Sequence, residues 1–216
     1  MFSHHKKFIA VSLLMFTLGF VSVLGYRIYQ TKKFKQISFF PQISDFKLQP
    51  PTLALTGNVE QINGEVKKRG REDKDFREIK TGEKIIQGEV LNTGEKARVD
   101  INFPGFVKLK IQPNSEIGFN DLIAEKFLIS LKNGNLNYEI TTDKSISVRS
   151  LHLLSTYMTG YGKINTNQDA GLINIEVASG SAKLALVDQE NNTQVVELNA
   201  GQKVEVDDTQ RTVQIL

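Results

Sequence analysis

The 216-residue chain contains no cysteine. This absence excludes disulfide bonds, thiolate metal ligands, a cysteine nucleophile and a bacterial lipoprotein anchor, because each requires a thiol. Histidine is also scarce: His4 and His5 lie near the N-terminus, and His152 is the one histidine of the remaining chain. Without a second imidazole, His152 cannot complete a metal pair or a proton shuttle, so we expect a packed or surface residue.

Patterns typical of catalytic sites are missing as well. No glycine-rich loop opens a helix, and serines such as Ser150 and Ser155 lack a nucleophile-elbow context. The carboxylates are dispersed, and the pair Asp207-Asp208 is typical of a solvated turn. We therefore expect no enzymatic activity, no cofactor and no metal. A glycan- or peptidoglycan-acting enzyme stays an alternative that would need a carboxylate pair in a cleft.

The net charge of +3 hides an asymmetry along the chain. Residues 1–47 hold seven Lys or Arg and one Asp, whereas residues 48–216 hold 20 basic and 23 acidic residues. The basic character therefore belongs to the N-terminal segment. A body with a slight negative balance is a poor general binder of nucleic acid, so no nucleic-acid partner is expected.

The basic N-terminal segment contains a long run without charge. Residues 8–26 hold no Asp, Glu, Lys or Arg over 19 positions, and a helix needs roughly 20 residues to cross a bilayer. Basic residues flank the run on both sides, and its C-terminal tyrosine suits a membrane interface. We predict a transmembrane anchor over 8–26, represented by Phe8, Leu14, Phe20 and Tyr26.

Cleavage and orientation of this anchor stay open. Val23-Leu24-Gly25 could serve as a cleavage site, but the apolar run exceeds the roughly 7–15 residues of a cleaved signal and Arg27 follows it directly, which favours an uncleaved anchor. A count of flanking positive charges would place the body in the cytoplasm. Because residues 1–7 resemble a signal n-region and long domains translocate largely regardless of charge, we expect a short cytoplasmic tail and an extracytoplasmic body.

Residues 27–52 predict a juxtamembrane stalk. Four phenylalanines are interleaved with Lys and Gln, and Pro50-Pro51 stiffens the exit. Aromatic residues beside a membrane helix already suit its interface, although a partner-docking stretch is an alternative.

Residues 53–216 alternate apolar and polar residues in short segments such as ARVDINF (97–103) and FVKLKIQ (106–112). A period of two predicts strands with one buried face and one wet face. No convincing helix follows the anchor, and DLIAEKFLISL (121–131) fits a strand better. The fold class is therefore mainly β, with a transmembrane helix before a single all-β, solenoid- or sandwich-like domain. Turns are predicted at Asn63-Gly64, Pro104-Gly105, Pro113-Asn114, Asn133-Gly134, Ser179-Gly180, Asn191-Asn192 and Ala200-Gly201.

A Gly-Glu pair recurs every six residues in TGEKIIQGEVLNTGEK (81–96). If Glu83, Glu89 and Glu95 converged with further oxygen ligands, they could hold a metal ion such as calcium. No Asp-rich ligand set accompanies them, and glycine adopts a positive φ without steric cost. We therefore predict a succession of tight turns with each Glu outside the bend.

This glycine-rich segment and its surroundings resemble the extracytoplasmic FecR domain of bacterial envelope proteins. The family pattern opens with Gly-x-Val, here Gly57-Asn58-Val59, and its glycine-rich centre is matched by residues 79–101 with Glu twice in place of Asp. Residues 103–117 follow, with Pro104-Gly105-Phe106 in place of Asp-Gly-Ser. Weaker matches continue in order through LKNGNLNYEI, SISVRS, TGYGKI, INIEVASGSAKLAL and LNAGQKVEV, so that roughly 54–206 is covered. The turn-forming glycines of this motif are Gly57, Gly82, Gly88, Gly94, Gly105, Gly134, Gly180 and Gly201.

The resemblance implies a β-rich domain outside the cytoplasmic membrane that works through protein contacts. Members that regulate iron uptake control a sigma factor with a long cytoplasmic tail and relay a signal through a further C-terminal subdomain. Only residues 1–7 precede the predicted anchor here, and about ten residues follow the last motif, so direct sigma-factor control is not carried over. We expect a non-enzymatic, single-pass protein of the bacterial inner membrane whose periplasmic domain binds another envelope protein, in signalling or envelope assembly.

A periplasmic carrier of lipid or lipopolysaccharide is the alternative, because an anchor with a small β-body also describes the bitopic component of lipopolysaccharide export. Such a carrier needs a hydrophobic groove between sheets.

The basic cluster KKRGRED (67–73) is offset by neighbouring carboxylates and is expected to be a solvated hairpin loop rather than a contact for anions. The identity of the partner and the oligomeric state stay open.

Fusion of a topology reporter after Leu216 tests the predicted orientation. A reporter active only outside the cytoplasm should be active, and one active only inside should be inactive, because the body is expected to cross the membrane. The reverse activities would place the body in the cytoplasm and remove the compartment that the family resemblance implies.

Overall fold

The computed structural model describes Tyr26 and residues 53–216. The predicted tail, the anchor residues Phe8, Leu14 and Phe20, and the predicted stalk lie outside the described residues. The backbone of Tyr26 is helical. Within the described residues, no helix has the length and apolar character needed to cross a bilayer. All described strands belong to the unit Pro51–Leu216.

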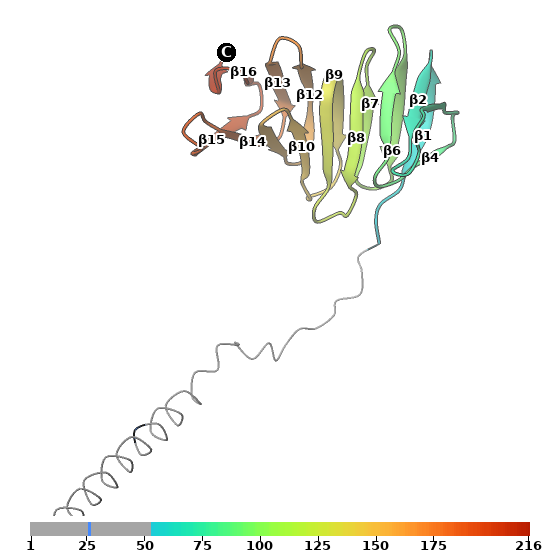
Figure 1. Cartoon of the computed structure of the whole chain (residues 1–216), viewed down its shortest axis with the longest axis horizontal. Helices are drawn as coiled ribbons and strands as arrows, with labels where there is room; N and C mark the ends of the chain where they lie inside the picture. The colour runs from blue at the N-terminus through green and yellow to red at the C-terminus, as the bar shows by residue number, and fades with distance from the viewer. Residues whose placement is uncertain (1–25, 27–52) are drawn as a thin grey trace, which may run out of the picture. The chain divides into compact units, whose positions relative to one another are not determined.

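Residues 53–216 contain strands and turns but no helix, which confirms the prediction of a mainly β domain (Figure 1). The strands form two sheets that face each other. In spatial order, sheet A contains β4 (Lys84–Ile85), β1 (Gly57–Asn63), β6 (Arg98–Phe103), β7 (Val107–Ile111), the second half of β9 (Leu128–Ile140), β12 (Gly160–Asn167), β13 (Leu172–Ser179), β16 (Lys203–Asp207) and β17 (Thr212–Ile215).

Sheet B is built in the same way along the other side of the core. In spatial order, it contains β3 (Arg77–Glu78), β2 (Val66–Arg69), β5 (Val90–Thr93), β8 (Glu116–Asp121), the first half of β9, β10 (Ile146–Ser150), β11 (Leu153–Tyr157), β14 (Ser181–Val187) and β15 (Thr193–Asn199). Neighbouring strands are antiparallel in both sheets, except for the parallel pair β9 and β10.

From β10 onward, the chain places its hairpins alternately in the two sheets. The hairpin β10–β11 lies in sheet B, β12–β13 in sheet A, β14–β15 in sheet B and β16–β17 in sheet A. Each hairpin therefore lengthens one sheet by two strands while the next covers its inner face. This alternation produces a sandwich that grows along one direction, as a solenoid does.

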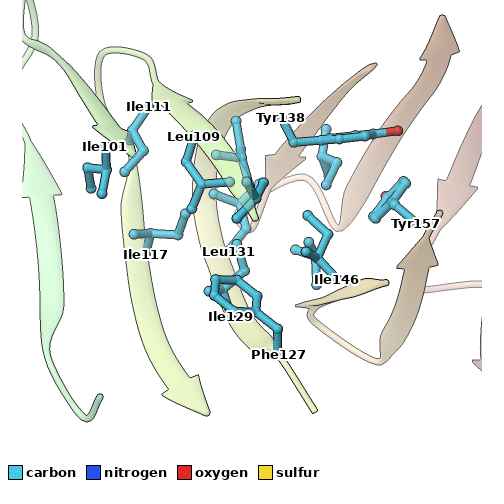
Figure 2. Close-up of a cluster of buried hydrophobic side chains, with 14 of the residues drawn as sticks. Ile101, Leu109, Ile111, Ile117, Phe127, Ile129, Leu131, Tyr138, Ile146 and Tyr157 are labelled. Carbon is cyan, nitrogen blue, oxygen red and sulfur yellow. The ribbon is translucent and has the colours of Figure 1, made fainter. Parts of the chain in front are cut away.

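The period-two pattern of the sequence places the apolar side chains between the two sheets (Figure 2). Phe103 of sheet A meets Phe127 edge-on with ring centroids 5.1 Å apart, and Tyr138 of sheet A lies 4.5 Å from Tyr157 of sheet B. Each fully buried aliphatic or phenyl side chain contributes about 1.5–3 kcal/mol relative to an exposed one. Contacts between the sheets, rather than within either, thus provide the main stabilisation.

Strand β9 joins the two sheets without a turn. Its residues up to Asn133 pair with β8 and β10, and those from Gly134 pair with β7 and β12. The inward side changes at this point from odd positions such as Ile129 to even positions such as Leu136. The prediction of a turn at Asn133-Gly134 was wrong, because the glycine bends a continuous strand rather than reversing the chain.

Buried hydroxyl groups hold this crossing in place. Ser115 and Thr93 are almost fully buried, and the Ser115 amide donates a 2.9 Å hydrogen bond to Thr93 Oγ1. The Ser115 hydroxyl accepts from the Asn135 amide at 3.0 Å and donates to the Gln112 carbonyl at 2.8 Å. Ser115, which follows the Pro113-Asn114 turn, therefore supplies the hydroxyl that satisfies the backbone where β9 changes sheets.

Replacement of Gly134 by alanine should destabilise the domain strongly. Gly134 has φ 99°, and an added Cβ would collide with Ser115, so conformational strain and overpacking together should lower the free energy of unfolding by about 3 kcal/mol or more. Gly105→Ala is the matched control: its φ is 68°, nothing lies within 4 Å of the added Cβ, and a cost of only about 1–2 kcal/mol is expected. Urea unfolding measures both, and equal losses would contradict the proposed role of the crossing.

Candidate functional site

The recurring Gly-Glu pairs close tight turns. Glu83 donates its amide to the Lys80 carbonyl at 3.1 Å, and its carboxylate accepts the Lys80 amide at 2.9 Å. Glu89 makes the same two bonds with Ile86, at 3.3 and 2.9 Å. Gly82 and Gly88 precede these glutamates with φ 87° and 88°, which suits the third position of a type II turn.

A third turn repeats this geometry with a glutamine. The Gln202 amide donates to the Asn199 carbonyl at 3.1 Å, and the Gln202 side-chain oxygen accepts the Asn199 amide at 2.6 Å. Gly201 has φ 85°. The side chain after the glycine therefore acts as an acceptor for the turn, whether or not it is charged.

Two of the predicted turn glycines have other roles. Gly94 lacks a positive φ; its amide donates to the Glu65 carbonyl at 2.9 Å, and the following Glu95 is exposed. Gly57 lies inside β1, where an added Cβ would stand 2.8 Å from Phe103 Cζ. Gly57 thus permits close packing rather than a turn. Gly105 and Gly180 lie between strands and have positive φ, as expected of turns.

Lys68 occupies an inward position of β2 and ties the Gly-Glu turns to sheet B. It is 5% exposed, and its Nζ lies 2.8 Å from Glu89 Oε1 and 3.8 Å from Glu83 Oε2. It also donates to the Lys84 carbonyl at 2.7 Å. The prediction that the basic cluster 67–73 is a solvated loop was therefore wrong for Lys68, because two glutamates that follow it in the sequence neutralise it inside the fold.

Both glutamates are consequently engaged by cations of the chain itself. Arg77 Nη1 lies 3.0 Å from Glu83 Oε2. Partial burial raises the pKa of Glu83, but the Lys80 amide, Arg77 and Lys68 act in the opposite direction and hold the pKa below its usual 4.5. Across Tyr26 and residues 53–216, no group of three or more His, Asp or Glu is arranged to hold a metal ion.

His152 has a structural role, because it contacts Asp208 in a turn far away in the sequence. Its amide donates to Asp208 Oδ1 at 3.0 Å, and its Nδ1 lies 2.9 Å from Asp208 Oδ2. These contacts join the turn between β10 and β11 to the turn between β16 and β17. The expectation of a solvated Asp207-Asp208 pair was wrong for Asp208, which is 9% exposed. Ser150 and Ser155 are fully buried, so neither hydroxyl is placed to attack a substrate.

The outer face of sheet B carries an apolar patch, which we define as Leu154, Ala185, Val187 and Val195. Leu154, Ala185 and Val195 are direct neighbours across β11, β14 and β15, and Val187 lies on the same face of β14. The exposed fractions of Leu154, Val187 and Val195 are 37%, 38% and 52%. A hollow of about 430 Å³ is lined by Leu154, Ala185 and Val187 of this patch together with Arg149 and His152.

The outer face of sheet A is polar instead. Its cross-strand neighbours include Asp100 and Lys110, Lys163 and Glu176, and Glu176 and Lys203. Glu176 lies 2.8 Å from Lys163 and 3.4 Å from Lys203, and both ammonium groups hold the pKa of Glu176 below its usual value. The two outer faces of the sandwich therefore differ in that sheet B carries the apolar patch, next to charged residues such as Lys183 and Glu197.

Breaking the buried ion pair should reveal how Lys68 and Glu89 depend on each other. Lys68→Met should lower the free energy of unfolding by about 3 kcal/mol, because it leaves a buried carboxylate without its cation. Lys68→Met combined with Glu89→Gln should recover most of this loss, since glutamine still accepts the Ile86 amide. Lys84→Met, on the outer face, is the control and should change little. Strictly additive losses in urea unfolding would argue against a coupled pair.

Comparison with known proteins gives a fold relationship. No family model matches the chain, and no curated protein sequence matches it. Two crystal structures of a candidate anti-sigma factor from Parabacteroides distasonis, at 2.50 and 1.65 Å resolution, are similar to this chain, each with a TM-score of 0.51. Identities are 12% and 11%, and the match covers 59% of this chain and 58% of that protein. The chain thus shares its fold with part of that anti-sigma factor.

Proposed function

We propose that this chain is a non-enzymatic, membrane-anchored envelope protein whose FecR-like domain lies on the periplasmic side of the bacterial inner membrane and binds another envelope protein. The fold shared with a candidate anti-sigma factor supports a regulatory, signalling role, and envelope assembly is the other setting in which such a domain would act. The glycine-rich motif over residues 79–101 and the uncharged run over 8–26 support the family and the anchor.

The apolar patch on sheet B is the observation that carries this proposal. Exposed aliphatic side chains gathered on one face, rather than scattered singly, mark protein interaction sites. Arg149 stands beside the patch as the cross-strand neighbour of Leu154 and makes no ion pair with any described residue. A partner with an apolar anchor and a nearby carboxylate fits this combination, because the anchor would cover the patch and the carboxylate would neutralise Arg149.

The alternative of a lipid or lipopolysaccharide carrier has less support. Such a carrier needs an apolar groove between the sheets, and here side chains from both sheets fill that space over residues 53–216. Phe103, Phe119 and Phe127 pack against one another across it. A long acyl chain would have to displace this core, which costs more than entering a preformed groove.

Photo-crosslinking in cells tests the docking surface. A photoreactive residue at position 195 should give a discrete crosslinked product with one partner protein, whereas the same residue at position 214 should not, because Gln214 is exposed on sheet A. Leu154→Asp should reduce the product at position 195 about ten-fold or more, since it places a charge in the apolar patch.

The purified Leu154→Asp variant should unfold in urea within about 1 kcal/mol of the parent chain, because the side chain lies on the outer face. This control separates lost docking from lost folding. Products of equal yield at positions 195 and 214, or a product that persists in the Leu154→Asp variant, would contradict docking on sheet B.

A further inference from the structure

A second hollow, of about 460 Å³, lies on the outer face of sheet A, on the opposite side of the sandwich from the apolar patch. It extends over β7, β9, β12 and β13, and its lining includes Tyr161, Lys108, Lys110, Asn137 and Glu139. Volumes of this size are typical of small-molecule sites. The proposal below concerns this hollow and does not depend on the docking surface on sheet B.

β12 contributes Tyr161, Gly162 and Lys163 to the lining of this hollow, beside an irregularity of the sheet. The pairing of β12 with β13 shifts between Tyr161 and Gly162. An added Cβ at Gly162 would lie 2.3 Å from the Glu176 carbonyl oxygen and 2.5 Å from the Tyr138 hydroxyl oxygen, so neighbouring atoms already fill the space that a side chain would need. Tyr138 is itself packed against Tyr157 in the core. Gly162 and Tyr138 both line the hollow, so the packed tyrosine pair supports its floor.

Tyr161 stands at the rim of this depression. It precedes Gly162 directly and is 55% exposed, the highest exposure of any tyrosine in residues 53–216. As part of the lining of the hollow, this exposed ring offers an apolar face that water covers poorly. The ring therefore presents a flat surface on which a ligand can stack.

The polar side chains around Tyr161 have unused hydrogen-bonding capacity. Lys108, Lys110, Asn137 and Glu139 make no side-chain hydrogen bond or ion pair with described residues, although Lys108 and Glu139 are direct cross-strand neighbours. Polar side chains pair elsewhere on the same face.

Three such pairs lie on this face, and the third, Lys163 and Glu176, belongs to the lining of the hollow itself. Asn102 donates to Glu60 at 2.7 Å, Asn165 donates to Asn135 at 2.5 Å, and Lys163 lies 2.8 Å from Glu176. The lining of the hollow therefore offers donors and acceptors without protein partners beside an exposed aromatic ring.

We propose that this hollow binds a saccharide that is uncharged or carries a single negative charge. Sugar hydroxyls both donate and accept hydrogen bonds, which matches the ammonium, amide and carboxylate groups present together. The apolar face of a sugar ring suits stacking on Tyr161.

The charge of the hollow distinguishes a saccharide from other small ligands. Lys108 and Lys110 exceed Glu139 by one positive charge, and Lys163 is balanced by Glu176. A multiply charged phosphate would gain from the lysines but would be repelled by both carboxylates, and it would make no use of the aromatic ring.

Binding of soluble trisaccharides to the purified full-length chain tests the proposal. Maltotriose and chitotriose are the uncharged probes, trigalacturonate is the acidic probe, and inorganic phosphate is the anion control. At least one trisaccharide should show saturation transfer from the protein by NMR and a measurable Kd by calorimetry. Tyr161→Ala should weaken this binding about ten-fold, through loss of stacking.

The double variant Lys108→Ala and Lys110→Ala should weaken binding of the same trisaccharide, and the loss of affinity should be largest for an acidic trisaccharide. Lys183→Ala is the matched control, since Lys183 lies on the outer face of sheet B and should leave the Kd unchanged. Leu154→Asp should also leave it unchanged, which distinguishes this site from the proposed protein-docking surface. Circular dichroism checks that each variant is folded.

Three outcomes would overturn the inference. No transfer from any of the three trisaccharides would mean that the hollow is not a saccharide site. Binding that Tyr161→Ala leaves unchanged would place the sugar elsewhere on the molecule. Binding of phosphate without binding of any trisaccharide would assign the lysines to an anion instead.

Discussion

Strand β9 belongs to both sheets, and its crossing at Gly134 is the constraint on which the rest of the sandwich depends. Because β9 is one continuous strand, it fixes the position and direction of sheet A relative to sheet B. The second half of β9 pairs with β7 and β12, and its first half pairs with β8 and β10. The crossing exposes backbone groups inside the core, and the hydroxyls of Ser115 and Thr93 satisfy them. Without these bonds, buried amides would lose their partners, at a cost of about 1–3 kcal/mol each, which is a large fraction of the stability of a typical domain.

Because the inner faces of the two sheets pack against each other, the two outer faces are the surfaces that remain for contacts with other molecules. These faces differ in chemistry although the same hairpins build them. Sheet B presents aliphatic side chains next to Arg149, a combination suited to a protein surface. Sheet A presents charged and amide side chains, some of them paired with each other, and the exposed ring of Tyr161 beside polar side chains without partners. One rigid scaffold can therefore offer two separate kinds of surface, and neither requires the core to open.

The glutamates of the Gly-Glu motif show how one residue type serves backbone and core together. Glu83 and Glu89 each accept a backbone amide within a turn and also face Lys68, which enters the sandwich from β2. A lysine in this position would be costly alone, and the turns supply its counter-charges. The motif thus stabilises folding rather than presenting ligands to a metal.

The strands, most turns and the inward residues could be predicted from the sequence, because side chains alternate along a strand and glycine alone accepts a positive φ cheaply. The tight turns at Gly82 and Gly88 follow from this local chemistry. The burial of Lys68 and Asp208, the bend at Asn133-Gly134 and the two hollows could not be predicted. Each depends on which strands lie side by side: Lys110, Asn137 and Lys163 meet only because β9 pairs with both β7 and β12. The local sequence pattern therefore determined which side of each strand is buried. The pairing of distant segments decided which side chains lie together on the outer faces, since the register between strands depends on the packing of the whole core.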